Sequence, residues 1–416
     1  MRIALVSPYD FPYPGGVTKH ITNLARSFQR RGHHVRIIAA SSRDAAEMPP
    51  EVIRISSFVV PIPYSGSVAR ISFSPRLAQR VGELLRRESF DVVHLHEPTT
   101  PTLPWAVLYQ ARRLSPQTAL IGTFHSYREP SAWSKLLPCE PYRYARLVFR
   151  RVVNSLDGRI AVSQVAHDYI NDYFPGTYRV IPNGVDLALF GNASLQPLPQ
   201  FASSLNILFV GRLEPRKGFG YLLEAFARVK TTLPEARLLI VGPYSAEDRA
   251  PFERAVDQWR LDGVHFIGYV PDAELARYYQ SSHVFCAPST GFESFGMVLL
   301  EAMAARTPVV ASDIEGYRTI VSHQVEGLLT PPRDSVTLAE ALVFLLQRPD
   351  LRQMMGARGQ ATASQYTWDR VADGVLGYYH DVLEWKRGTD TVRVSQLEPG
   401  GVSSYRDGSP LRGKVG

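Results

Sequence analysis

Short apolar segments alternate with amphipathic, helix-like segments along most of the chain, and the alternation runs through two separate series. Strands that alternate with helices form βαβ units, in which the strands of one sheet run parallel and the helices cover its faces. We therefore expect an α/β protein with two doubly wound domains. The predicted strands are Ile3–Val6, Val35–Ala39, Val92–Leu95, Leu120–Phe124, Ile160–Val162, Leu205–Val210, Leu238–Val241, Val264–Ile267, Val284–Ala287 and Val309–Ala311.

The two series are separated by a segment rich in Pro, Ser and Gln, Ser194–Ser204, which is typical of a linker. A chain of 416 residues also has the length of two ordinary domains. We predict a first domain over residues 1–182, which the C-terminal helix 367–386 joins, and a second domain over residues 205–366. Residues 387–416 contain few apolar side chains and are predicted to form a disordered tail.

Glycines and cations follow the first strand of each series. Parallel sheets bind ligands beyond the carboxyl ends of their strands, and the free N–H groups at a helix start attract anions. Gly15 and Gly16 would let a phosphate approach the backbone of the first loop, although a simple tight turn is an equal alternative. Arg212 and Lys217 lie in a glycine-framed loop of the second series and could face a diphosphate, with a solvated charge run as the alternative.

The segment Ser289–Met303 combines a polar loop with two carboxylates. It follows a predicted strand and enters a helix at Ser294-Phe295-Gly296, so that its backbone forms a further anion site. Glu293 precedes the first turn and would face whatever group the phosphates carry. Glu301 lies further along the helix, where its carboxylate can accept two ribose hydroxyls. Two carboxylates that flank a phosphate site predict a nucleotide-sugar as the ligand.

His125 ends a predicted strand of the first series, at the edge of the same cleft. A lone histidine is more often structural, but here the imidazole could hydrogen-bond a sugar or the reacting centre. We expect His94 and His96 to point to opposite faces of their strand, which makes them poor ligands for one metal ion. The chain has no Asp-x-Asp segment, and we predict no metal ligands.

The formal net charge of +7 suits nucleic acid, an anionic membrane surface or phosphorylated ligands as partners. No apolar run is long enough to cross a bilayer, the first apolar segment is too short for a signal peptide, and the two cysteines have no metal-type spacing. We therefore expect a soluble or peripheral protein of the reducing cytosol. Two predicted helices carry arginine stripes that could attract anionic lipid: Arg76, Arg80 and Arg87 in one, and Arg143, Arg146 and Arg150 in the other.

Taken together, these motifs resemble the donor-site signature of the retaining glycosyltransferases of family 4, which have the two-domain GT-B fold. The resemblance extends from residue 1 to about residue 385. The motifs are Gly15-Gly16, His125, Pro182-Asn-Gly-Val-Asp186, Arg212 with Lys217, and the pair Glu293 and Glu301. Within that family, Val60–Arg70, His94–Pro98 and Thr290–Gly296 are similar to the phosphatidylinositol mannosyltransferases of mycobacteria and their relatives, which move mannose from GDP-mannose to the inositol ring of a membrane lipid.

The resemblance implies a role for each motif residue. On the donor side, the diphosphate would contact Gly15, Gly16, Arg212 and Lys217, and the ribose would contact Glu301. The base would lie beside Val270 and Asp272. The mannose and phosphate would contact Glu293 and the backbone of Ser294, Phe295 and Gly296. The residues implied in catalysis are His125, which would lie beside the transferred sugar, Arg212, Lys217 and Glu293. The implied acceptor residues are Tyr9, Thr18, Tyr64, Ser65, Arg70 and Ser126.

Several positions depart from the family pattern, and one departure is Ser126–Pro130, which lacks the Thr/Lys pattern expected after His125. Thr18 stands where the family usually has Gln, and Ser65 stands where Asn is usual, so these changes concern the acceptor rather than the donor chemistry. Arg306 stands where the family normally has Gly after a helix. If Arg306 is left-handed, the side chain costs about 1 kcal/mol there.

The function implied by the resemblance is transfer of mannose from GDP-mannose to phosphatidylinositol by a peripheral enzyme on the inner face of the cell membrane. No residue is an evident nucleophile, so the leaving diphosphate would take the acceptor's proton while Arg212 and Lys217 stabilise its charge. Any Mg²⁺ would be associated with the donor diphosphate. Two alternatives stay open: a family 4 enzyme with another UDP- or GDP-linked sugar and a different lipid or soluble acceptor, and a non-catalytic basic binding protein. The chain has no base-stacking motif, which argues against nucleic acid as a partner.

Overall fold

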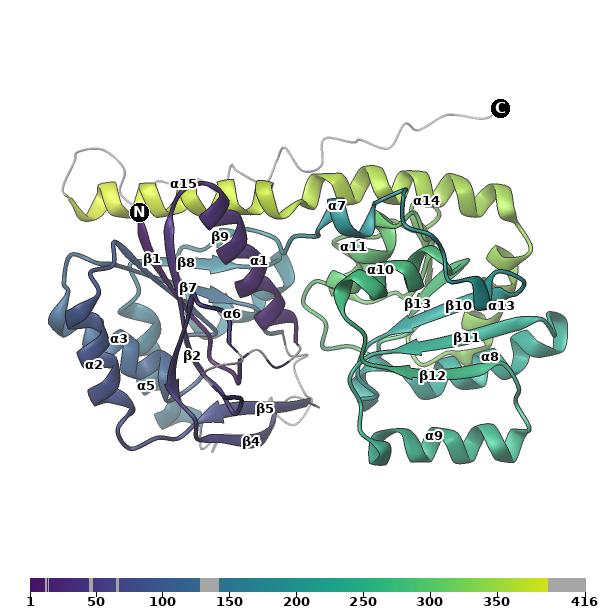
Figure 1. Ribbon diagram of the computed structural model, residues 1–416, viewed down its shortest axis with the longest axis horizontal. Coiled ribbons are helices and arrows are strands. Elements are labelled where there is room, and N and C mark those ends of the chain that lie inside the picture. The colour runs from purple at the N-terminus through teal and green to yellow at the C-terminus, as the bar shows by residue number, and fades with distance from the viewer. Residues whose placement is uncertain (12, 14, 45–47, 65–66, 128–141, 388–416) are drawn as a thin grey trace.

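The computed structural model describes residues 1–11, 13, 15–44, 48–64, 67–127 and 142–387. Two parallel sheets lie side by side, each accompanied by helices, and a long helix runs along one side of the molecule (Figure 1). The α/β architecture expected from the alternating pattern is therefore present in both halves. The tail predicted for residues 387–416 lies almost wholly outside the described residues. No helix in the described part of the chain is long and apolar enough to cross a membrane.

The first sheet has seven strands in the order β3-β2-β1-β6-β7-β8-β9, all parallel to their neighbours. Its helices and a separate antiparallel hairpin, β4 with β5, lie in the same half of the chain. The strands are β1 Arg2–Val6, β2 His34–Ala40, β3 Val52–Ser56, β4 Val59–Tyr64, β5 Ser67–Ser72, β6 Val92–His96, β7 Ala119–Phe124, β8 Gly158–Ala161 and β9 Arg179–Val180. The helices are α1 Gly16–Arg30, α2 Leu77–Arg87, α3 Leu103–Leu114, α5 Tyr142–Asn154 and α6 Gln164–Tyr173.

The second sheet has six parallel strands in the order β12-β11-β10-β13-β14-β15. The order reverses between β10 and β13, which is where open parallel sheets place their ligands. The strands are β10 Leu205–Val210, β11 Ala236–Val241, β12 Val264–Gly268, β13 Val284–Ala287, β14 Val309–Ser312 and β15 Gly327–Thr330. The helices are α7 Leu187–Phe190, α8 Phe219–Thr232, α9 Ala246–Trp259, α10 Asp272–Gln280, α11 Met297–Ala304, α12 Glu315–Arg318, α13 Ser335–Leu346 and α14 Pro349–Ala363.

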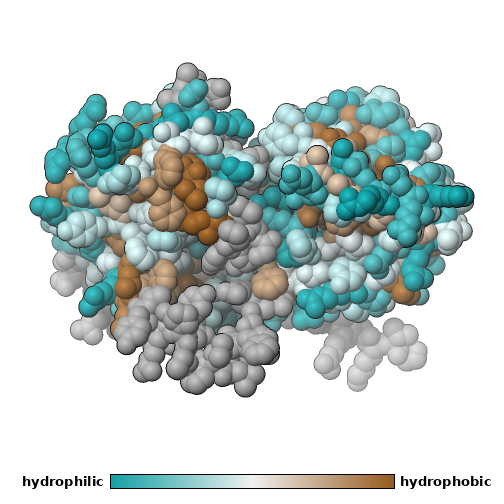
Figure 2. Space-filling model, turned by 90° about the horizontal axis from the view of Figure 1, so that it is seen from below, coloured by the Kyte–Doolittle hydropathy of each residue, from teal (hydrophilic) through white to brown (hydrophobic). Residues whose placement is uncertain are grey.

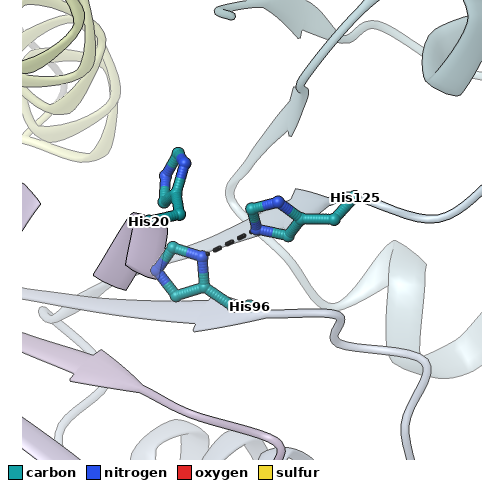
Figure 3. Close-up of side chains that lie close together, drawn as sticks. All are labelled: His20, His96 and His125. Carbon is teal, nitrogen blue, oxygen red and sulfur yellow. Dashed lines mark hydrogen bonds between the residues drawn. The ribbon is translucent and has the colours of Figure 1, made fainter. Parts of the chain in front are cut away.

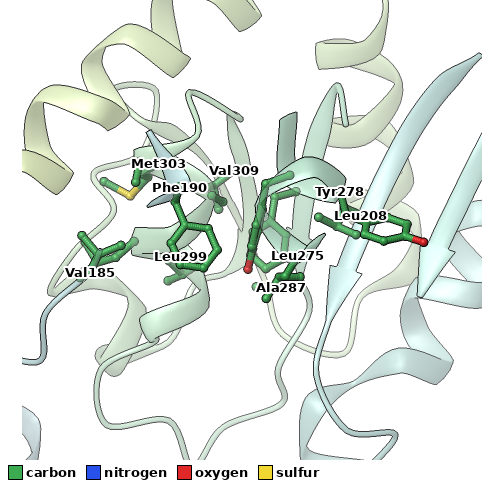
Figure 4. Close-up of a cluster of buried hydrophobic side chains, with 14 of the residues drawn as sticks. Val185, Phe190, Leu208, Leu275, Tyr278, Ala287, Leu299, Met303 and Val309 are labelled. Atoms are coloured by element: carbon green, nitrogen blue, oxygen red, sulfur yellow. The ribbon is translucent and has the colours of Figure 1, made fainter. Parts of the chain in front are cut away.

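Helix α11 is held by one of the largest apolar clusters of the protein. Leu299 and Met303 of this helix pack with Phe190 of α7, Leu275 of α10 and Val309 of β14 (Figure 4). Burial of such side chains contributes about 1.5 to 3 kcal/mol each. The cluster therefore fixes the start of α11, which the sequence identifies as an anion site.

The chain crosses between the two halves twice, at neighbouring points. Val185 forms a parallel bridge with Thr367 and donates its N–H to the Tyr366 carbonyl at 2.7 Å. Helix α15, Trp368–Lys386, then returns to the first sheet and buries its apolar face against β1 and α1. The last long helix therefore packs with the first half of the chain.

Arg306 is left-handed, with φ at 60°, as the departure from glycine suggested. Its guanidinium donates to Gln360 at 2.7 Å, and Gly356 packs against its carbonyl oxygen. The tight contact between α11 and α14 therefore offsets the backbone strain of about 1 kcal/mol at Arg306.

We predict that Gly184→Ala destabilises the protein by about 1 to 3 kcal/mol, because a Cβ at this position would lie 2.6 Å from the Trp368 ring. Urea denaturation measures the change. Gly377→Ala in α15 is the matched control, since nothing lies within 4 Å of its Cβ position and alanine favours an exposed helical site. Equal stability of the two variants would show that the Gly184 contact with Trp368 is not tight.

Candidate active site

A cavity of about 250 Å³ lies between the two halves, beyond the carboxyl ends of β1, β7, β10 and β13. Residues from both halves line it, so the two sheets together form one cleft. Among the residues predicted from the sequence, those that line it are Tyr9, Gly15, Gly16, Thr18, Arg70, His125, Ser126, Arg212, Glu293 and Ser294. The other predicted donor-site residues do not line it: Lys217, Val270, Asp272, Phe295, Gly296 and Glu301. Ser65 and the Tyr64 side chain are outside the described part of the structure.

Glu293 is a buried carboxylate that is held by two cations. Its Oε1 accepts hydrogen bonds at 2.6 Å from both Arg216 and Lys217, and the three side chains are at most 16% exposed. Burial disfavours the charged form of Glu293, but the charges of Lys217 and Arg216 outweigh it and hold its pKa below the usual value. Burial also lowers the pKa of Lys217, and the Glu293 charge offsets this only in part. Glu293 is therefore an ionised group at the centre of a positive pocket.

The sequence singled out Arg212 and Lys217, whereas the cation that lines the cavity beside Arg212 is Arg216. The short 3₁₀ turn Pro215–Lys217 directs both of its cations to Glu293. Glu214 was also missed, and it pairs with Arg212 and with Arg216, each at 3.0 Å. The signal in the sequence was the adjacent Arg-Lys pair before a glycine, but only the turn shows which member faces the cavity.

Gly296 is the N-cap residue of helix α11 and is left-handed, with φ at 95°. The side chain of Phe295 is buried in the apolar cluster, so only its backbone is available to a ligand. Ser294 donates its hydroxyl to the His125 carbonyl at 2.6 Å, which joins the two halves at the cavity. The start of α11 therefore offers backbone N–H groups next to His125.

Glu301 and Asp272 are joined by a lysine from the opposite half of the chain. Lys19 of α1 lies 2.6 Å from Glu301 Oε1 and 3.2 Å from Asp272 Oδ1. Burial would lower the pKa of Lys19, but the two carboxylates outweigh it and raise that pKa. Tyr279 donates to the other oxygen of Glu301 at 3.1 Å. Sequence reasoning identified the two carboxylates and missed Lys19 and Tyr279, because the contact joins residues that are far apart in the chain.

His125 is fixed from three directions. Its Nε2 lies 3.0 Å from His96 Nδ1 (Figure 3), its backbone N–H donates to Glu97 at 2.7 Å, and its carbonyl accepts from Ser294. Glu97 also accepts from the Ser126 hydroxyl at 2.9 Å. The imidazole therefore has one nitrogen committed to His96 at the edge of the cavity.

The expectation that His94 and His96 point to opposite faces was wrong. Their rings lie 4.3 Å apart, because residues two apart in a strand share a face. His94 is bonded to Tyr379 and to Thr123, each at 2.6 Å, and is buried behind His96.

His20, His96 and His125 bring possible ligand nitrogens within 4.8 Å of one another (Figure 3). Two nitrogens bound to one zinc ion at about 2.0 to 2.1 Å can be at most about 4.2 Å apart. Two of the nitrogens here are already hydrogen-bonded to each other. The group as arranged is a hydrogen-bonded histidine cluster, and we assign it no metal.

Four of the six predicted acceptor residues line the first-domain wall of the cavity: Tyr9, Thr18, Arg70 and Ser126. The Arg70 guanidinium lies 4.4 Å above the Tyr13 ring, and the Arg70 carbonyl accepts from the Asp10 N–H at 2.8 Å. Asp10 was not predicted, yet its buried carboxylate lines the cavity and accepts from the Ser42 N–H and hydroxyl at 2.8 and 2.7 Å. This wall therefore combines aromatic rings, one arginine and a fixed carboxylate.

Two family profiles match the chain. The profile described as "Glycosyltransferase Family 4" matches residues 14–189, and that described as "Glycosyl transferases group 1" matches residues 196–362. The chain is 38% identical to a phosphatidyl-myo-inositol mannosyltransferase of Mycobacterium leprae, over 92% of this chain and 97% of the relative. It is 30% identical to a D-inositol 3-phosphate glycosyltransferase of Segniliparus rotundus, over 92% and 89%.

Solved structures share the fold at lower identity. A sucrose-phosphate synthase from Thermosynechococcus elongatus is similar with a TM-score of 0.70 and 23% identity, over 92% of this chain and 99% of the other. A glycosyltransferase from Rickettsia africae is similar with a TM-score of 0.72 and 19% identity, over 92% and 98%. At these identities the likeness concerns the fold alone.

The buried histidines predict that the protein loses stability in mild acid. Burial lowers the pKa of His20 to about 4 and that of His94 to about 3, whereas an unfolded histidine titrates near 6.5. The unfolded chain therefore binds more protons below about pH 6.5, and the free energy of unfolding should fall by about 1.4 kcal/mol per pH unit for each of the two histidines, down to about pH 4. Urea denaturation at pH 7.5, 6.0 and 5.0 measures this slope.

His94→Gln is the control, because it removes one of the two groups and should reduce the slope by about one proton. If the free energy of unfolding fell with pH equally steeply in the parent and in this variant, the lowered pKa assigned to His94 would be contradicted.

Proposed function

This chain belongs to glycosyltransferase family 4 and has the GT-B fold, and we propose that it transfers mannose from GDP-mannose to the inositol head group of phosphatidylinositol. The observation that carries the proposal is the match over nearly the whole length of the phosphatidyl-myo-inositol mannosyltransferases. The cavity supports it, because its second-domain wall is charged for a diphosphate and its first-domain wall is suited to a polyol. The reaction is a group transfer between two ligands held on opposite walls.

On the donor side, Arg212, Arg216 and Lys217 supply positive charge for the two phosphates. The N–H groups at the start of α11 and the loop at Gly15 and Gly16 face the same cavity or border it. Fixed cations and backbone dipoles stabilise the charge that develops on the leaving diphosphate without reorganising during the reaction. Glu293 keeps Lys217 and Arg216 in place, and because it lines the cavity it would face the sugar.

The reaction breaks the bond between the anomeric carbon and the diphosphate oxygen, and it forms a bond from that carbon to an inositol oxygen on the same face of the sugar. The inositol proton passes to the departing diphosphate. Glu293 and Asp10 are engaged with cations and with Ser42 respectively, so the described residues offer no free carboxylate pair to Mg²⁺ in this cavity. Mg²⁺ would be held by the diphosphate itself and would neutralise part of its charge.

We further propose that the enzyme works as a peripheral protein on the cytoplasmic face of the membrane. Helix α2 has the predicted arrangement, with Leu77, Val81 and Leu85 buried. The arginines of its stripe, Arg76, Arg80 and Arg87, are exposed, although Arg80 also donates to the Ile55 carbonyl. Of the second stripe, the side chains of Arg143 and Arg146 lie outside the described residues.

Apolar side chains support the same orientation. Leu147 and Val148 of α5 are exposed beside Arg150, and Figure 2 shows hydrophobic side chains gathered in patches on the first domain. Leu147, Val148 and Arg150 line one shallow hollow, and basic and apolar groups that lie together favour contact with anionic lipid.

A matrix of donors and acceptors tests the proposal. GDP-mannose, GDP-glucose and UDP-glucose are each combined with phosphatidylinositol vesicles, with inositol 3-phosphate and with no acceptor. We expect transfer only from GDP-mannose to phosphatidylinositol. Transfer to inositol 3-phosphate from a UDP-linked sugar would favour the second candidate, a soluble-acceptor enzyme, which the 30% identical relative supports.

We predict that Glu293→Gln and Lys217→Ala each lower kcat by about 100-fold or more, because each removes a fixed charge next to the leaving group. Steady-state kinetics with the active donor measure the loss. Glu224→Gln on the exposed face of α8 is the control and should leave kcat unchanged. Parent-like rates in either site variant, with intact thermal unfolding, would contradict the assigned site.

Replacement of Arg76, Arg80 and Arg87 by Ser should weaken binding to anionic vesicles, because each charge contributes about 1 kcal/mol near such a surface. Vesicle sedimentation at low and high salt measures the loss, and binding of GDP should not change. The control replaces Arg228, Arg254 and Arg358, three exposed arginines of the second half, and alters the net charge equally. Equal loss in both triple variants would show that net charge, and not this face of α2, governs binding.

A further inference from the structure

We propose that His96 is a positioning residue that fixes the tautomer of His125. In this arrangement His96 donates a hydrogen bond from Nδ1 to His125 Nε2, so His125 carries its own proton on Nδ1, at the cavity. The hydrogen bond and its consequence for the tautomer depend only on the described contacts. Only the identity of the ligand group that His125 contacts during transfer depends on the proposed function.

The two imidazoles share one hydrogen bond, and each contributes one nitrogen to it. His96 Nδ1 and His125 Nε2 are 3.0 Å apart (Figure 3). Burial lowers the pKa of both histidines well below the usual value, so both rings are neutral near pH 7. A neutral imidazole carries one N–H and one lone pair. Only two arrangements are therefore possible, and they differ in which ring donates.

The other nitrogen of His96 distinguishes these arrangements. His96 is fully buried, and its Nε2 has no hydrogen-bond partner in the described part of the structure. If His125 were the donor, the His96 proton would sit on this nitrogen as an unpaired buried N–H. If His96 is the donor, the nitrogen carries only a lone pair. Unpaired buried N–H groups are rarer than unpaired acceptors, so donation by His96 is favoured.

Neighbouring groups do not supply the missing acceptor. His20 Nδ1 faces the Asn183 carbonyl oxygen at 2.7 Å and must donate to it, which leaves His20 Nε2 as a lone pair that also has no described partner. His94 is occupied by Tyr379 and Thr123. His20 and His96 therefore each direct a proton to a partner from Nδ1 and leave a lone pair on Nε2, where the described residues offer no partner.

His125 then presents a donor to the cavity. It lines the cavity, and its Nε2 is engaged by His96, so Nδ1 is the nitrogen left for a ligand. The Glu97 and Ser294 contacts of its backbone hold the ring in place between the two halves. An Nδ1–H can donate to a sugar or inositol oxygen but cannot accept a proton from it. His125 is therefore a hydrogen-bond donor in the reaction and not its base.

Nuclear magnetic resonance of the full chain labelled with ¹⁵N-histidine tests the tautomer directly. The His125 signal is assigned by its loss in His125→Gln. We expect Nδ1 of His125 to be protonated and Nε2 to be bare at pH 7.5. The opposite pattern would overturn the proposal, and this readout does not depend on the donor or the acceptor.

Three substitutions of His96 test the positioning role. Asn places an amide N–H near the position of Nδ1 and can still donate to His125, whereas Gln extends past it and Leu cannot donate. We expect His96→Asn to keep the tautomer and most of the turnover. His96→Leu and His96→Gln should lower kcat by about 10- to 100-fold with little change in the KM for the donor, as for other groups that orient an imidazole.

His94→Gln is the matched control, because it alters an equally buried neighbour that has no bond to His125. It should leave the tautomer of His125 unchanged. If His96→Leu retained parent kcat while His125 stayed protonated on Nδ1, the positioning role would be refuted and the transferase assignment would stand. If no donor supported transfer in the parent protein, the proposed function would fail, and the tautomer measurement would still decide this inference.

Discussion

A carboxylate buried between two cations organises the second half of the cleft. Glu293 is stable as an anion only because Arg216 and Lys217 approach it, and they can do so only if three loops meet. Gly218 and Gly316 make this possible, since a Cβ on either would lie within 2 Å of the carbonyl oxygen of Pro288 or of Glu293. The packed loops and the ion pairs therefore depend on each other, and together they define the charge of the wall.

The two halves are joined at both ends of the cleft by contacts of different kinds. At the crossing, the Val185 bridge and the Trp368 contact with Gly184 are backbone and apolar interactions. At the cavity, the contacts are polar, such as Ser294 with His125 and Tyr127 with Glu315 at 3.2 Å. Polar contacts at a ligand site exchange more readily with ligand and water than apolar ones do. The crossing is therefore held by backbone and apolar contacts, and the two halves meet at the cavity through polar ones.

The sequence predicted the parallel sheets because apolar strands and helices have different periods, and it predicted the carboxyl-end loops because parallel sheets bind ligands there. It did not predict the hairpin β4 with β5, because β4 contains two prolines. It also missed Lys19, Glu214 and Asp10, whose importance comes from partners that only the folded chain brings near. The error over His94 and His96 was one of strand geometry, and their sequence was sufficient to avoid it.

Lys19 supplies, from within the protein, a counter-ion for Glu301 and Asp272. A ligand that binds the Glu301 carboxylate has to displace the Lys19 ammonium. The free energy needed to break this ion pair therefore reduces the measured binding free energy of the ligand. The exchange also ties ligand binding at Glu301 to the separation of the two halves, since the lysine and the carboxylates belong to opposite halves. Dissolved salt enters the same equilibrium, because it screens the internal pair and the incoming phosphates alike.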